Sequence, residues 1–381
     1  MKNHLLRSLP VFFGFFIMGF VDAVGIATNY IKKDFGLTDT VANFLPMMVF
    51  LWFFIFSVPT GLLMNRIGRK KTVMLSMAVQ IVALIVPVIA YNYAVMLVAF
   101  ALIGIGNTII QVSLNPLLSN VVSPAKLTSS LTLGQFIKAI SSFLGPVIAA
   151  FFARSFGSWE LMFPTYAGIT LLSSLWLMAT PIEEAPLTGK TSTFGECISL
   201  LGNRNILLLF LGILTVVGID VGLNVTAPKI LQERTAMSLE NASYAISLYF
   251  VFKTIGAFSG SIILSVFSAK RIYVISAIAA LIAITGLVFA SHLALLYVLI
   301  ALTGLVCASM FSIIFSFALK ILPEKSNEIS GLMIMGVSGG ALFPLLMGVA
   351  SDTAGAQWGA AVVLVLCCAY QLFLSMFVKE K

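Results

Sequence analysis

Charged side chains are scarce in this chain of 381 residues, where Asp, Glu, Lys and Arg together make up only 9% of the sequence. Histidine, the side chain most often used for acid and base chemistry, occurs only twice, as His4 and His292. The sequence also lacks the Gly-x-Ser-x-Gly and His-Glu-x-x-His patterns of common hydrolases. We therefore do not expect an enzyme.

Cysteine is equally sparse, and its four positions follow no recognisable plan. Cys197, Cys307, Cys367 and Cys368 have neither the spacing of a zinc site nor the arrangement of a disulfide framework. We therefore expect no metal site and no cofactor.

Hydrophobic residues, by contrast, make up 60% of the chain, and the mean hydropathy is +1.08. A soluble domain does not need so much apolar sequence, so the composition predicts an all-α, polytopic membrane protein. A membrane-crossing helix needs about 20 residues. The first apolar stretch is too long for a cleavable signal peptide, so we count it as a span. The twelve predicted transmembrane helices cover residues 9–30, 41–64, 72–91, 94–121, 128–153, 160–180, 205–228, 241–267, 272–290, 293–320, 328–350 and 357–377.

The 22 Lys and Arg residues are unevenly distributed between the predicted loops. Most lie in the N-terminal segment and in the loops after every second span, such as Arg66 to Lys71 and Lys270 with Arg271. Because basic loops stay in the cytoplasm, we expect both termini there and the chain in the cell inner membrane. The net charge of +8 thus indicates topology and not nucleic-acid binding. We expect a monomer surrounded by membrane lipid.

Asp22 stands out because it interrupts the stretch 13–28, which is otherwise apolar. A charged side chain at the centre of a membrane helix costs roughly 2.5–3.5 kcal/mol, so it is kept where it meets a partner, a cavity or an ion. The same pattern returns at Asp220, and each aspartate stands six residues before a threonine. Two related halves are typical of secondary transporters, which makes both acids candidates for ion coupling. We predict two pseudo-symmetric six-helix bundles at 1–180 and 205–381, joined by a cytoplasmic linker at 181–204 that contains a short helix.

A glycine-containing basic turn joins the second and third spans. It resembles the signature of the major facilitator superfamily, Gly-x-x-x-Asp-Arg-x-Gly-Arg, with Asn65 in place of the aspartate. Glycines let two helices approach closely, while the basic residues pair with helix ends or acids in one state and release them in another. We expect the loss of the aspartate to weaken the ion pair of this gate. The gating motif comprises Gly61, Asn65, Arg66, Gly68, Arg69 and Lys70.

The fourth predicted span is unusually polar, with Gln111 and Asn115 four residues apart on one helical face. Such amides suit sugar hydroxyls, and they suit hydrogen bonds between helices as well. The Gly-x-Gly pattern followed by Asn115 and Pro116 resembles the fucose permease group, the fucose:proton symporters of that superfamily, as do stretches in the fifth, tenth and eleventh spans. This resemblance implies two helix bundles around a central cavity and sugar uptake coupled to an ion.

The departures from that group concern its proton relay. Gln111 occupies the place of a glutamate and cannot titrate, and Asp22 lies about one helical turn from the position of the group's own aspartate. The sequence therefore leaves the coupling ion open between a proton and sodium.

Two lysines, Lys138 and Lys253, fall inside predicted spans. A buried lysine is as costly as a buried aspartate, so we expect ion pairs of Asp22 with Lys138 and of Asp220 with Lys253. The second pair would echo the first. Alternatively, the lysines face the solute and bind an anion.

These patterns favour secondary active transport of a small polar solute, foremost a monosaccharide or a sugar derivative, by alternating access. A carrier of an anionic sugar acid or another organic anion is the alternative. A drug-type efflux antiporter, suggested by Gly145 and Pro146, and a non-transporting receptor are further ones. Aromatic residues such as Trp52 either stack on a sugar ring or pack between helices. The candidate solute-binding residues are Gln111, Asn115, Gln135, Lys138, Asn224, Tyr249, Lys253 and Phe311.

Overall fold

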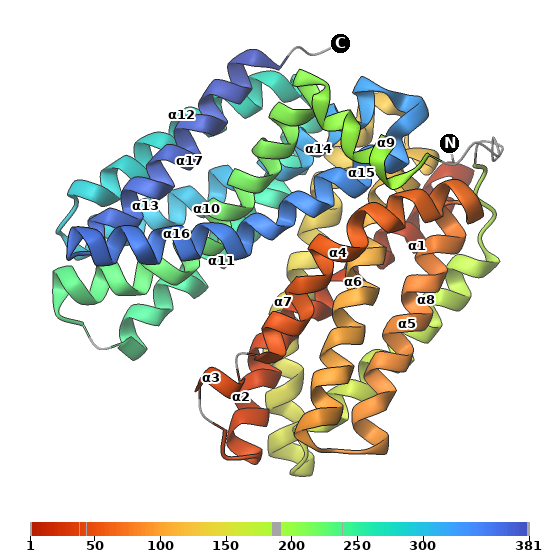
Figure 1. Ribbon diagram of the computed structural model, residues 1–381, viewed down its shortest axis with the longest axis horizontal. Coiled ribbons are helices and arrows are strands. Elements are labelled where there is room, and N and C mark those ends of the chain that lie inside the picture. The colour runs from red at the N-terminus through yellow and green to blue at the C-terminus, as the bar shows by residue number, and fades with distance from the viewer. Residues whose placement is uncertain (1, 38, 43, 185–191, 238, 379–381) are drawn as a thin grey trace. The chain divides into compact units, whose positions relative to one another are not determined.

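The computed structural model describes residues 2–37, 39–42, 44–184, 192–237 and 239–378, which form helices and short connections (Figure 1). No strand occurs within these ranges, so the predicted all-helical fold is confirmed. The α-helices are α1 (Lys2–Met18), α2 (Val24–Asp34), α3 (Asp39–Ala42), α4 (Phe44–Ile67), α5 (Arg69–Ile89), α6 (Tyr93–Val121), α7 (Leu127–Phe156), α8 (Met162–Ala179), α9 (Phe194–Ser199), α10 (Arg204–Thr235), α11 (Leu239–Val266), α12 (Ala269–Phe289), α13 (Leu293–Cys307), α14 (Met310–Ile321), α15 (Ser326–Met335), α16 (Gly339–Ala354) and α17 (Trp358–Phe377). The 3-10 turns are η1 (Gly19–Ala23), η2 (Pro124–Lys126), η3 (Trp159–Leu161), η4 (Leu200–Gly202), η5 (Pro323–Lys325) and η6 (Gly336–Ser338).

Twelve segments of the described chain are long and apolar enough to cross a membrane, which confirms the twelve predicted spans. Their ends differ from the prediction by a few residues, and the seventh span runs on to Thr235. The first, tenth and eleventh spans are interrupted inside, the first by η1 between α1 and α2. Irregular backbone at membrane depth is tolerated where it is buried in protein or lines a cavity. The interruption of the first span contains Asp22.

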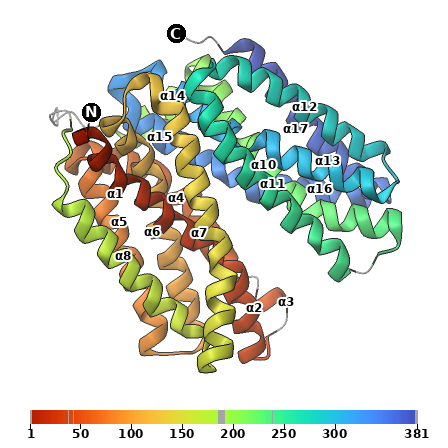
Figure 2. The same ribbon diagram turned by 180° about the vertical axis from the view of Figure 1, so that it is seen from behind.

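The helices gather into two compact units, and each unit contains a piece from the other half of the sequence. In unit 1, α1 packs against α6 and α8 (Figure 2), and α15 packs against α4 and α6. In unit 2, Thr128 at the start of α7 shares a hydrogen bond of 2.7 Å with Ser316 of α14. The division by sequence at 180 and 205 stays a prediction. Unit 1 comprises Met1–Leu127, Ile137–Ile198 and Lys325–Met335, and unit 2 comprises Thr128–Phe136, Ser199–Glu324 and Gly336–Lys381.

The two units repeat one close helix contact. In unit 1, a Cβ atom on Gly104 of α6 would lie 2.5 Å from the carbonyl oxygen of Val49 in α4. In unit 2, a Cβ atom on Gly304 of α13 would lie 2.4 Å from the carbonyl oxygen of Tyr249 in α11. Only glycine permits so close an approach. The same sequence offset separates the two glycines and the two carbonyl groups, as expected of related halves.

A buried amide in α17 fixes α10 within unit 2. Gln371 has no exposed surface and accepts a hydrogen bond of 2.6 Å from the hydroxyl of Tyr273 in α12. Its Nε2 donates to the carbonyl oxygen of Gly212 at 2.8 Å and to Thr215 Oγ1 at 2.7 Å, both in α10. A buried amide with its bonds made rigidifies the helices around it. The helix that carries Asp220, α10, is therefore held in a fixed position against α17.

Candidate functional site

The first span changes its helical form at Asp22, the acid that sequence analysis singled out. α1 ends at Met18, the backbone takes the 3-10 form over Gly19–Ala23, and α2 begins at Val24. Asp22 is the exposed member of this turn, and the other four residues are buried. A 3-10 stretch inside a longer helix often marks a hinge or a functional site. The spacing of the sequence did not predict this break.

Glycines bring the turn η1 against α7. A Cβ atom on Gly19 would lie 2.6 Å from the carbonyl oxygen of Lys138 and 2.7 Å from Cβ of Ser141. Further along α7, a Cβ atom on Gly145 would lie 3.0 Å from Cβ of Ala23. Small residues at both places allow the two backbones to pack closely. Gly145, which suggested an antiporter signature, thus has a packing role here.

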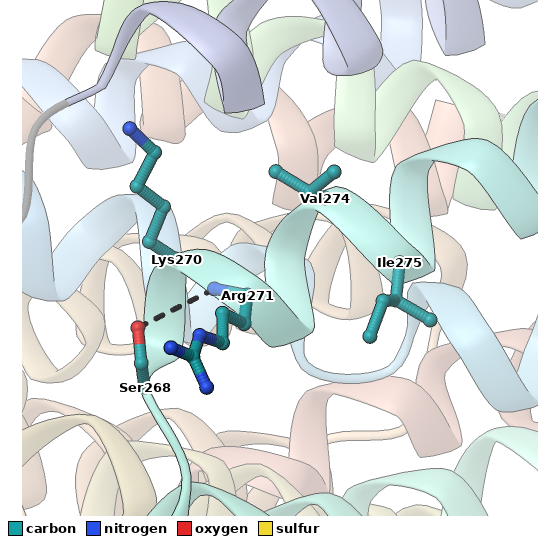
Figure 3. A pocket seen from close by; sticks show the side chains of 5 residues that line it. All are labelled: Ser268, Lys270, Arg271, Val274 and Ile275. Carbon is teal, nitrogen blue, oxygen red and sulfur yellow. Dashed lines mark hydrogen bonds between the residues drawn. The ribbon is translucent and has the colours of Figure 1, made fainter.

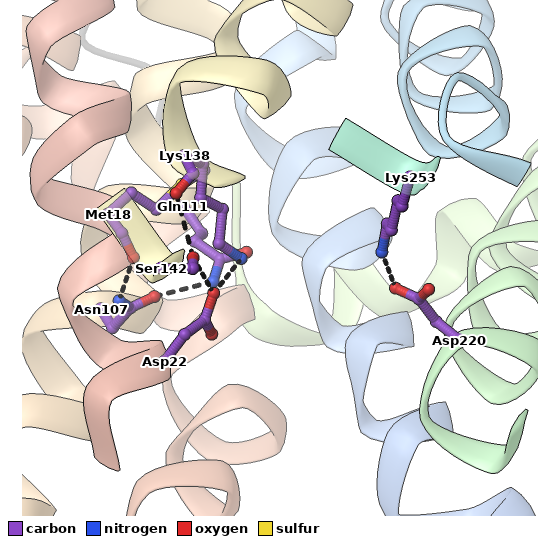
Figure 4. Close-up of polar contacts among 8 residues, drawn as sticks. All are labelled: Met18, Asp22, Asn107, Gln111, Lys138, Ser142, Asp220 and Lys253. Carbon is purple, nitrogen blue, oxygen red and sulfur yellow. Dashed lines mark hydrogen bonds and ion pairs between the residues drawn. The ribbon is translucent and has the colours of Figure 1, made fainter. Parts of the chain in front are cut away.

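Asp22 meets two polar groups of α7 (Figure 4). Ser142 Oγ donates a hydrogen bond of 2.5 Å to Asp22 Oδ2, and Lys138 Nζ lies 4.0 Å from the same oxygen. The predicted ion pair of Asp22 with Lys138 therefore forms, at the outer limit of contact distance. The side chain of Asp22 is 41% exposed and that of Lys138 is 22% exposed. The carboxylate therefore keeps accessible surface beside these two contacts.

A line of buried amides in α6 reaches the same turn (Figure 4). Asn107 Nδ2 donates to the carbonyl oxygen of Met18 at 2.9 Å, and Gln111 Nε2 donates to Asn107 Oδ1 at 2.7 Å. Asn115 Nδ2 donates to the carbonyl oxygen of Gln111, in its own helix, at 2.8 Å. None of the three amide side chains is more than 7% exposed. The Gln111 side chain thus bonds within α6, and the contact with α1 is made by Asn107. Sequence analysis missed Asn107, although the preceding Gly-x-Gly pattern pointed to its neighbourhood.

Asp220 makes closer contacts in unit 2. The hydroxyl of Tyr249 donates to Oδ1, and the ammonium of Lys253 donates to Oδ2, the contact drawn in Figure 4. Asn224 Nδ2 donates to the carbonyl oxygen of Asp220 at 2.7 Å, one turn along α10. The side chains of Asp220 and Lys253 are 30% and 28% exposed, and Tyr249 is 1% exposed. The predicted pair of Asp220 with Lys253 is confirmed, with Tyr249 as an additional hydrogen-bond donor.

The other candidate solute residues are half-buried or retain an unused acceptor. Phe311 of α14 is half-buried and stacks on Phe315 with ring centroids 5.7 Å apart. Gln135 is half-buried in the part of α7 that belongs to unit 2. Among the residues described, Oδ1 of Asn115 and Oδ1 of Asn224 accept no hydrogen bond. Within the described ranges of the chain, no group of three or more His, Cys, Asp or Glu residues could hold a metal ion. A solute role for these side chains stays a prediction.

The basic turn between α4 and α5 depends on two glycines and one acid. Gly68 has a φ of +89°, a conformation that favours glycine. A Cβ atom on Gly61 would lie 2.7 Å from a carbonyl oxygen of α15. The backbone N–H groups of Arg69 and Lys70 donate to the two oxygens of Glu184 at 2.6 and 2.8 Å. A carboxylate therefore caps the start of α5, where the helix dipole favours negative charge.

α15 closes over this turn through amides and a buried acid. Asn65 Nδ2 donates to Glu328 Oε1 at 2.7 Å, and Asn327 Nδ2 donates back to Asn65 Oδ1 at 2.7 Å. Arg69 donates to Asn327 Oδ1 at 2.8 Å and to Ser326 Oγ at 2.5 Å. Glu328 is only 3% exposed. The acid that the motif lacks at Asn65 is thus supplied by α15, from a residue that sequence analysis did not identify.

Further contacts surround the motif. Lys70 Nζ donates to two carbonyl oxygens at the end of α8, at 3.1 and 2.8 Å, while Arg66 is exposed. Cys197 of α9 is buried, with Sγ 3.7 Å from the carbonyl oxygen of Glu328. Burial raises the pKa of the Cys197 thiol to about 12, and the charge of Glu328 acts in the same direction. This thiol therefore stays protonated and unreactive while it is buried.

The corresponding turn of the second half, between α11 and α12, has kept only the glycine, Gly260, and the basic end, Lys270 with Arg271. Ser268 Oγ caps α12 by accepting a hydrogen bond of 3.4 Å from the backbone N–H of Arg271. A surface hollow of about 410 Å³ lies beside this turn, lined by Ser268, Lys270, Arg271, Val274 and Ile275 (Figure 3). All five residues come from one end of one helix, so the hollow lacks the enclosing walls of a small-molecule site.

Comparisons with known proteins agree with the geometry. The chain is 27% identical to a glucose/galactose transporter of Brucella abortus (strain 9-941) over 397 aligned positions, which cover 98% of this chain and 94% of that protein. A variant of the Escherichia coli fucose:proton symporter matches with a TM-score of 0.86 at 18% identity, over 100% of this chain and 99% of the other. A proton:xylose symporter bound to 6-bromo-6-deoxy-D-glucose matches with a TM-score of 0.74 at 14% identity, over 99% and 95%.

The structural matches confirm the predicted twelve-helix transporter fold and bear on the fold alone. The family model of the Major Facilitator Superfamily matches this sequence twice, over residues 11–238 and 209–381. Together the two matches span nearly the whole chain, which places it among transporters and not among enzymes. The chain belongs to the Major Facilitator Superfamily.

Proposed function

We propose that this protein is a secondary active transporter that carries a sugar across the membrane together with a coupling ion, by alternating access of its two helix bundles. The observation that carries the proposal is the geometry at Asp22, an exposed carboxylate in a broken membrane helix with a lysine at contact distance. The names of the relatives support a sugar, since one is a glucose/galactose transporter and two structural neighbours are fucose:proton and proton:xylose symporters.

The coupling ion that we propose is a proton. Asp22 has the ammonium of Lys138 at 4.0 Å and the hydroxyl of Ser142 at 2.5 Å. The ammonium opposes the binding of a metal cation at the same oxygen, because like charges repel strongly in a medium of low polarity. A proton needs only one carboxylate oxygen and neutralises the acid outright. Once Asp22 takes the proton, Lys138 loses its partner, which links ion binding to the fit of η1 against α7.

The solute that we propose is a neutral monosaccharide. Both membrane lysines already have a carboxylate partner, Lys138 in Asp22 and Lys253 in Asp220. Neither lysine is therefore a surplus cation for a sugar acid.

Amide and aromatic side chains supply the solute contacts in this proposal. Gln135 suits sugar hydroxyls, which both donate and accept hydrogen bonds. The Oδ1 atoms of Asn115 and Asn224 are buried and accept no hydrogen bond from the described residues, so each has an acceptor to offer once a helix movement exposes it. The ring of Phe311 suits the apolar face of a sugar.

We also propose that the chain is a monomer of the cell inner membrane, with both termini in the cytoplasm and bundles at 1–180 and 205–381 joined by the linker 181–204. The concentration of Lys and Arg in the loops after every second span supports this orientation. On this topology, the contact between Asn65 and Glu328 lies at the cytoplasmic end of unit 1.

Transport into proteoliposomes tests the proposal. We expect D-glucose, D-galactose or L-fucose to accumulate when a pH gradient with an alkaline interior is imposed, and not under a matched sodium gradient. Asp22→Asn should abolish this accumulation and spare exchange of labelled sugar across the membrane, because an uncharged amide mimics the protonated acid in both orientations. Asp352→Asn changes an exposed acid at the end of α16 and serves as the matched control.

Several outcomes would contradict parts of the proposal. Accumulation under the sodium gradient alone replaces the proton with sodium. Uptake of hexuronates but not of neutral sugars makes the protein an anion carrier, and sugar export driven by proton entry makes it an antiporter. If Asp22→Asn accumulates sugar like the wild type, Asp22 has a structural role only.

A further inference from the structure

Both polar atoms of the Asn107 side chain form hydrogen bonds to other groups of the protein (Figure 4). Its side chain is 2% exposed, its Nδ2 donates to the carbonyl oxygen of Met18 at 2.9 Å, and its Oδ1 accepts from Gln111 at 2.7 Å. It therefore has little to offer a solute. We propose that Asn107 is a positioning residue, whose amide holds the 3-10 turn η1 and thereby aims Asp22 at α7. This inference rests on the proposed role of Asp22 in ion coupling.

The direction of the Asp22 side chain depends on the form of the turn. Successive residues rotate by about 100° around an α-helix and by about 120° around a 3-10 helix. If the four steps from Met18 to Asp22 returned to the α-helical form, the Asp22 side chain would swing by about 80° around the helix axis. That rotation removes the carboxylate from Ser142, whose hydroxyl now lies 2.5 Å away. The contacts of Asp22 therefore require the 3-10 form.

The hydrogen bond from Asn107 acts where the α-helical pattern stops. Met18 is the last residue of α1 and the N-cap of η1, so its carbonyl group stands where the α-helical hydrogen-bond pattern gives way to the 3-10 pattern. A polar side chain that enters the backbone hydrogen-bond ladder is a known cause of helix breaks. Gln111 sets the orientation of the amide: because it donates to Oδ1 of Asn107, Nδ2 is the atom that faces Met18. The two amides thus form one directed chain from α6 to the turn.

The turn is held from a second side by α7, where Gly19 packs closely against the backbone at Lys138. The amide fixes the rotation of the turn about the helix axis, and the glycine contact fixes its distance from α7. With both in place, the carboxylate of Asp22 has one orientation relative to Ser142 and Lys138. A mobile turn would instead allow the Asp22 carboxylate several orientations, which weakens any interaction that requires one fixed orientation.

Unit 2 supplies an internal comparison. The equivalent glycine contacts at Gly104 and Gly304 place Cys307 at the position that corresponds to Asn107. There α10 runs without interruption through Asp220. The half with the amide has the broken helix, and the half without it has a regular one, as expected if the amide stabilises the break.

Asn107→Leu in the full-length protein tests the inference, because leucine keeps the bulk of the side chain and removes both hydrogen bonds. We expect hydrogen exchange of the backbone amides at 19–23 to become about two- to tenfold faster, the factor for one lost hydrogen bond. Proton-driven sugar accumulation should fall about tenfold or more, while sugar exchange stays within about twofold of the wild type. Thr108→Val is the matched control, since the Thr108 hydroxyl donates to Gly104 in its own helix at 2.8 Å.

Asn107→Asp provides a second measurement in case the leucine variant does not fold. A protonated aspartic acid can donate to Met18 and accept from Gln111, whereas a carboxylate cannot donate. Compared with the wild type at each pH, this variant should behave normally in acid and should lose both exchange protection at 19–23 and accumulation as the pH rises.

Unchanged exchange protection at 19–23 in Asn107→Leu, or in Asn107→Asp at high pH, would overturn the positioning role. Lost protection together with normal accumulation would overturn it too, because the turn would then not govern Asp22. If the wild-type protein accumulates no sugar, the proposed function is contradicted instead. Hydrogen exchange of the backbone amides at 19–23 then still decides whether Asn107 holds the turn.

Discussion

Asp22 and Asp220 share a sequence pattern and differ in their surroundings. Asp22 lies in a 3-10 turn, with Lys138 at 4.0 Å and 41% of its side chain exposed. Asp220 lies in a continuous helix, where Tyr249 and Lys253 each occupy one of its oxygens. Both contacts of Asp22, from Ser142 and Lys138, fall on Oδ2 and leave Oδ1 free to take another partner, whereas a carboxylate with a donor on each oxygen is fixed. A repeated acid therefore need not have a repeated role, and we propose ion exchange at Asp22 and support at Asp220.

The lysine partners come from different places in the repeat. Counted from the equivalent turns η2 and η5, Lys138 corresponds to Val337. Counted from the glycine contacts that α4 and α11 share, Lys253 corresponds to Phe53, which is buried. Both predicted pairs form, but one is not a copy of the other. Each half balances its acid with a cation of its own.

The largest stability effect should come from Lys253→Met in unit 2. Breaking a fully buried ion pair costs about 3–5 kcal/mol, and because both partners here are close to one third exposed we expect about 1–3 kcal/mol. Denaturant unfolding in detergent, followed by the fluorescence of the tryptophans, measures the loss. The double variant Lys253→Met with Asp220→Asn should recover most of it. A single variant as stable as the wild type would remove the distinction between the two pairs.

An intermediate effect should come from Gly19→Ala, which acts on the turn of unit 1. The added methyl group meets the carbonyl oxygen of Lys138 at 2.6 Å, so the turn must move away from α7 at a cost of about 1–2 kcal/mol, in the lower part of the range for an overpacked contact. Gly25→Ala in the same span is the control, because a Cβ atom there meets nothing within 4 Å. We expect a lower melting temperature and weaker accumulation for the first variant alone. Equal behaviour of the two would mean that close packing does not set the position of Asp22.

The smallest stability effect should come from Lys138→Met. A pair at 4.0 Å with a carboxylate 41% exposed contributes about 0–1 kcal/mol, so the melting temperature should barely change. Transport should respond nevertheless, because the coupling ion no longer competes with the ammonium. We expect the half-saturating proton concentration for uptake to fall by up to about fivefold, the factor that corresponds to 1 kcal/mol. A loss of stability as large as that of Lys253→Met would refute the contrast between a loose and a fixed pair.

The twelve spans and both ion pairs could be predicted from the sequence, since they follow from local properties. Apolar stretches of sufficient length cross membranes, and acids and lysines inside them are too costly to remain alone. The break in the first span could not be predicted, because it depends on Asn107, which lies 89 positions from Met18. Composition likewise did not indicate that residues 325–335 pack with helices of the first half. Contacts between residues so far apart in the sequence produce no local residue pattern from which they could be predicted.

The basic turn between α4 and α5 is a second case in which local sequence was insufficient. Asn65 predicted a weakened contact, because the acid expected at that position was absent. The structure places Glu328 against it, and Glu184 at the start of α5. Both acids stand in segments that carry no motif, so only the fold reveals what they do.

The acid that contacts Asn65 is Glu328, which lies 263 positions along the chain from the place where the motif expects it. Because Asn65 and Glu328 meet across one hydrogen bond, an amide and an acid could trade places between them and leave the contact chemically complete. We therefore expect some relatives to carry the acid at the first position and others at the second, with the two positions changing together during evolution. A pattern search that requires aspartate at the first position discards chains like this one, although the contact between an amide and an acid is present.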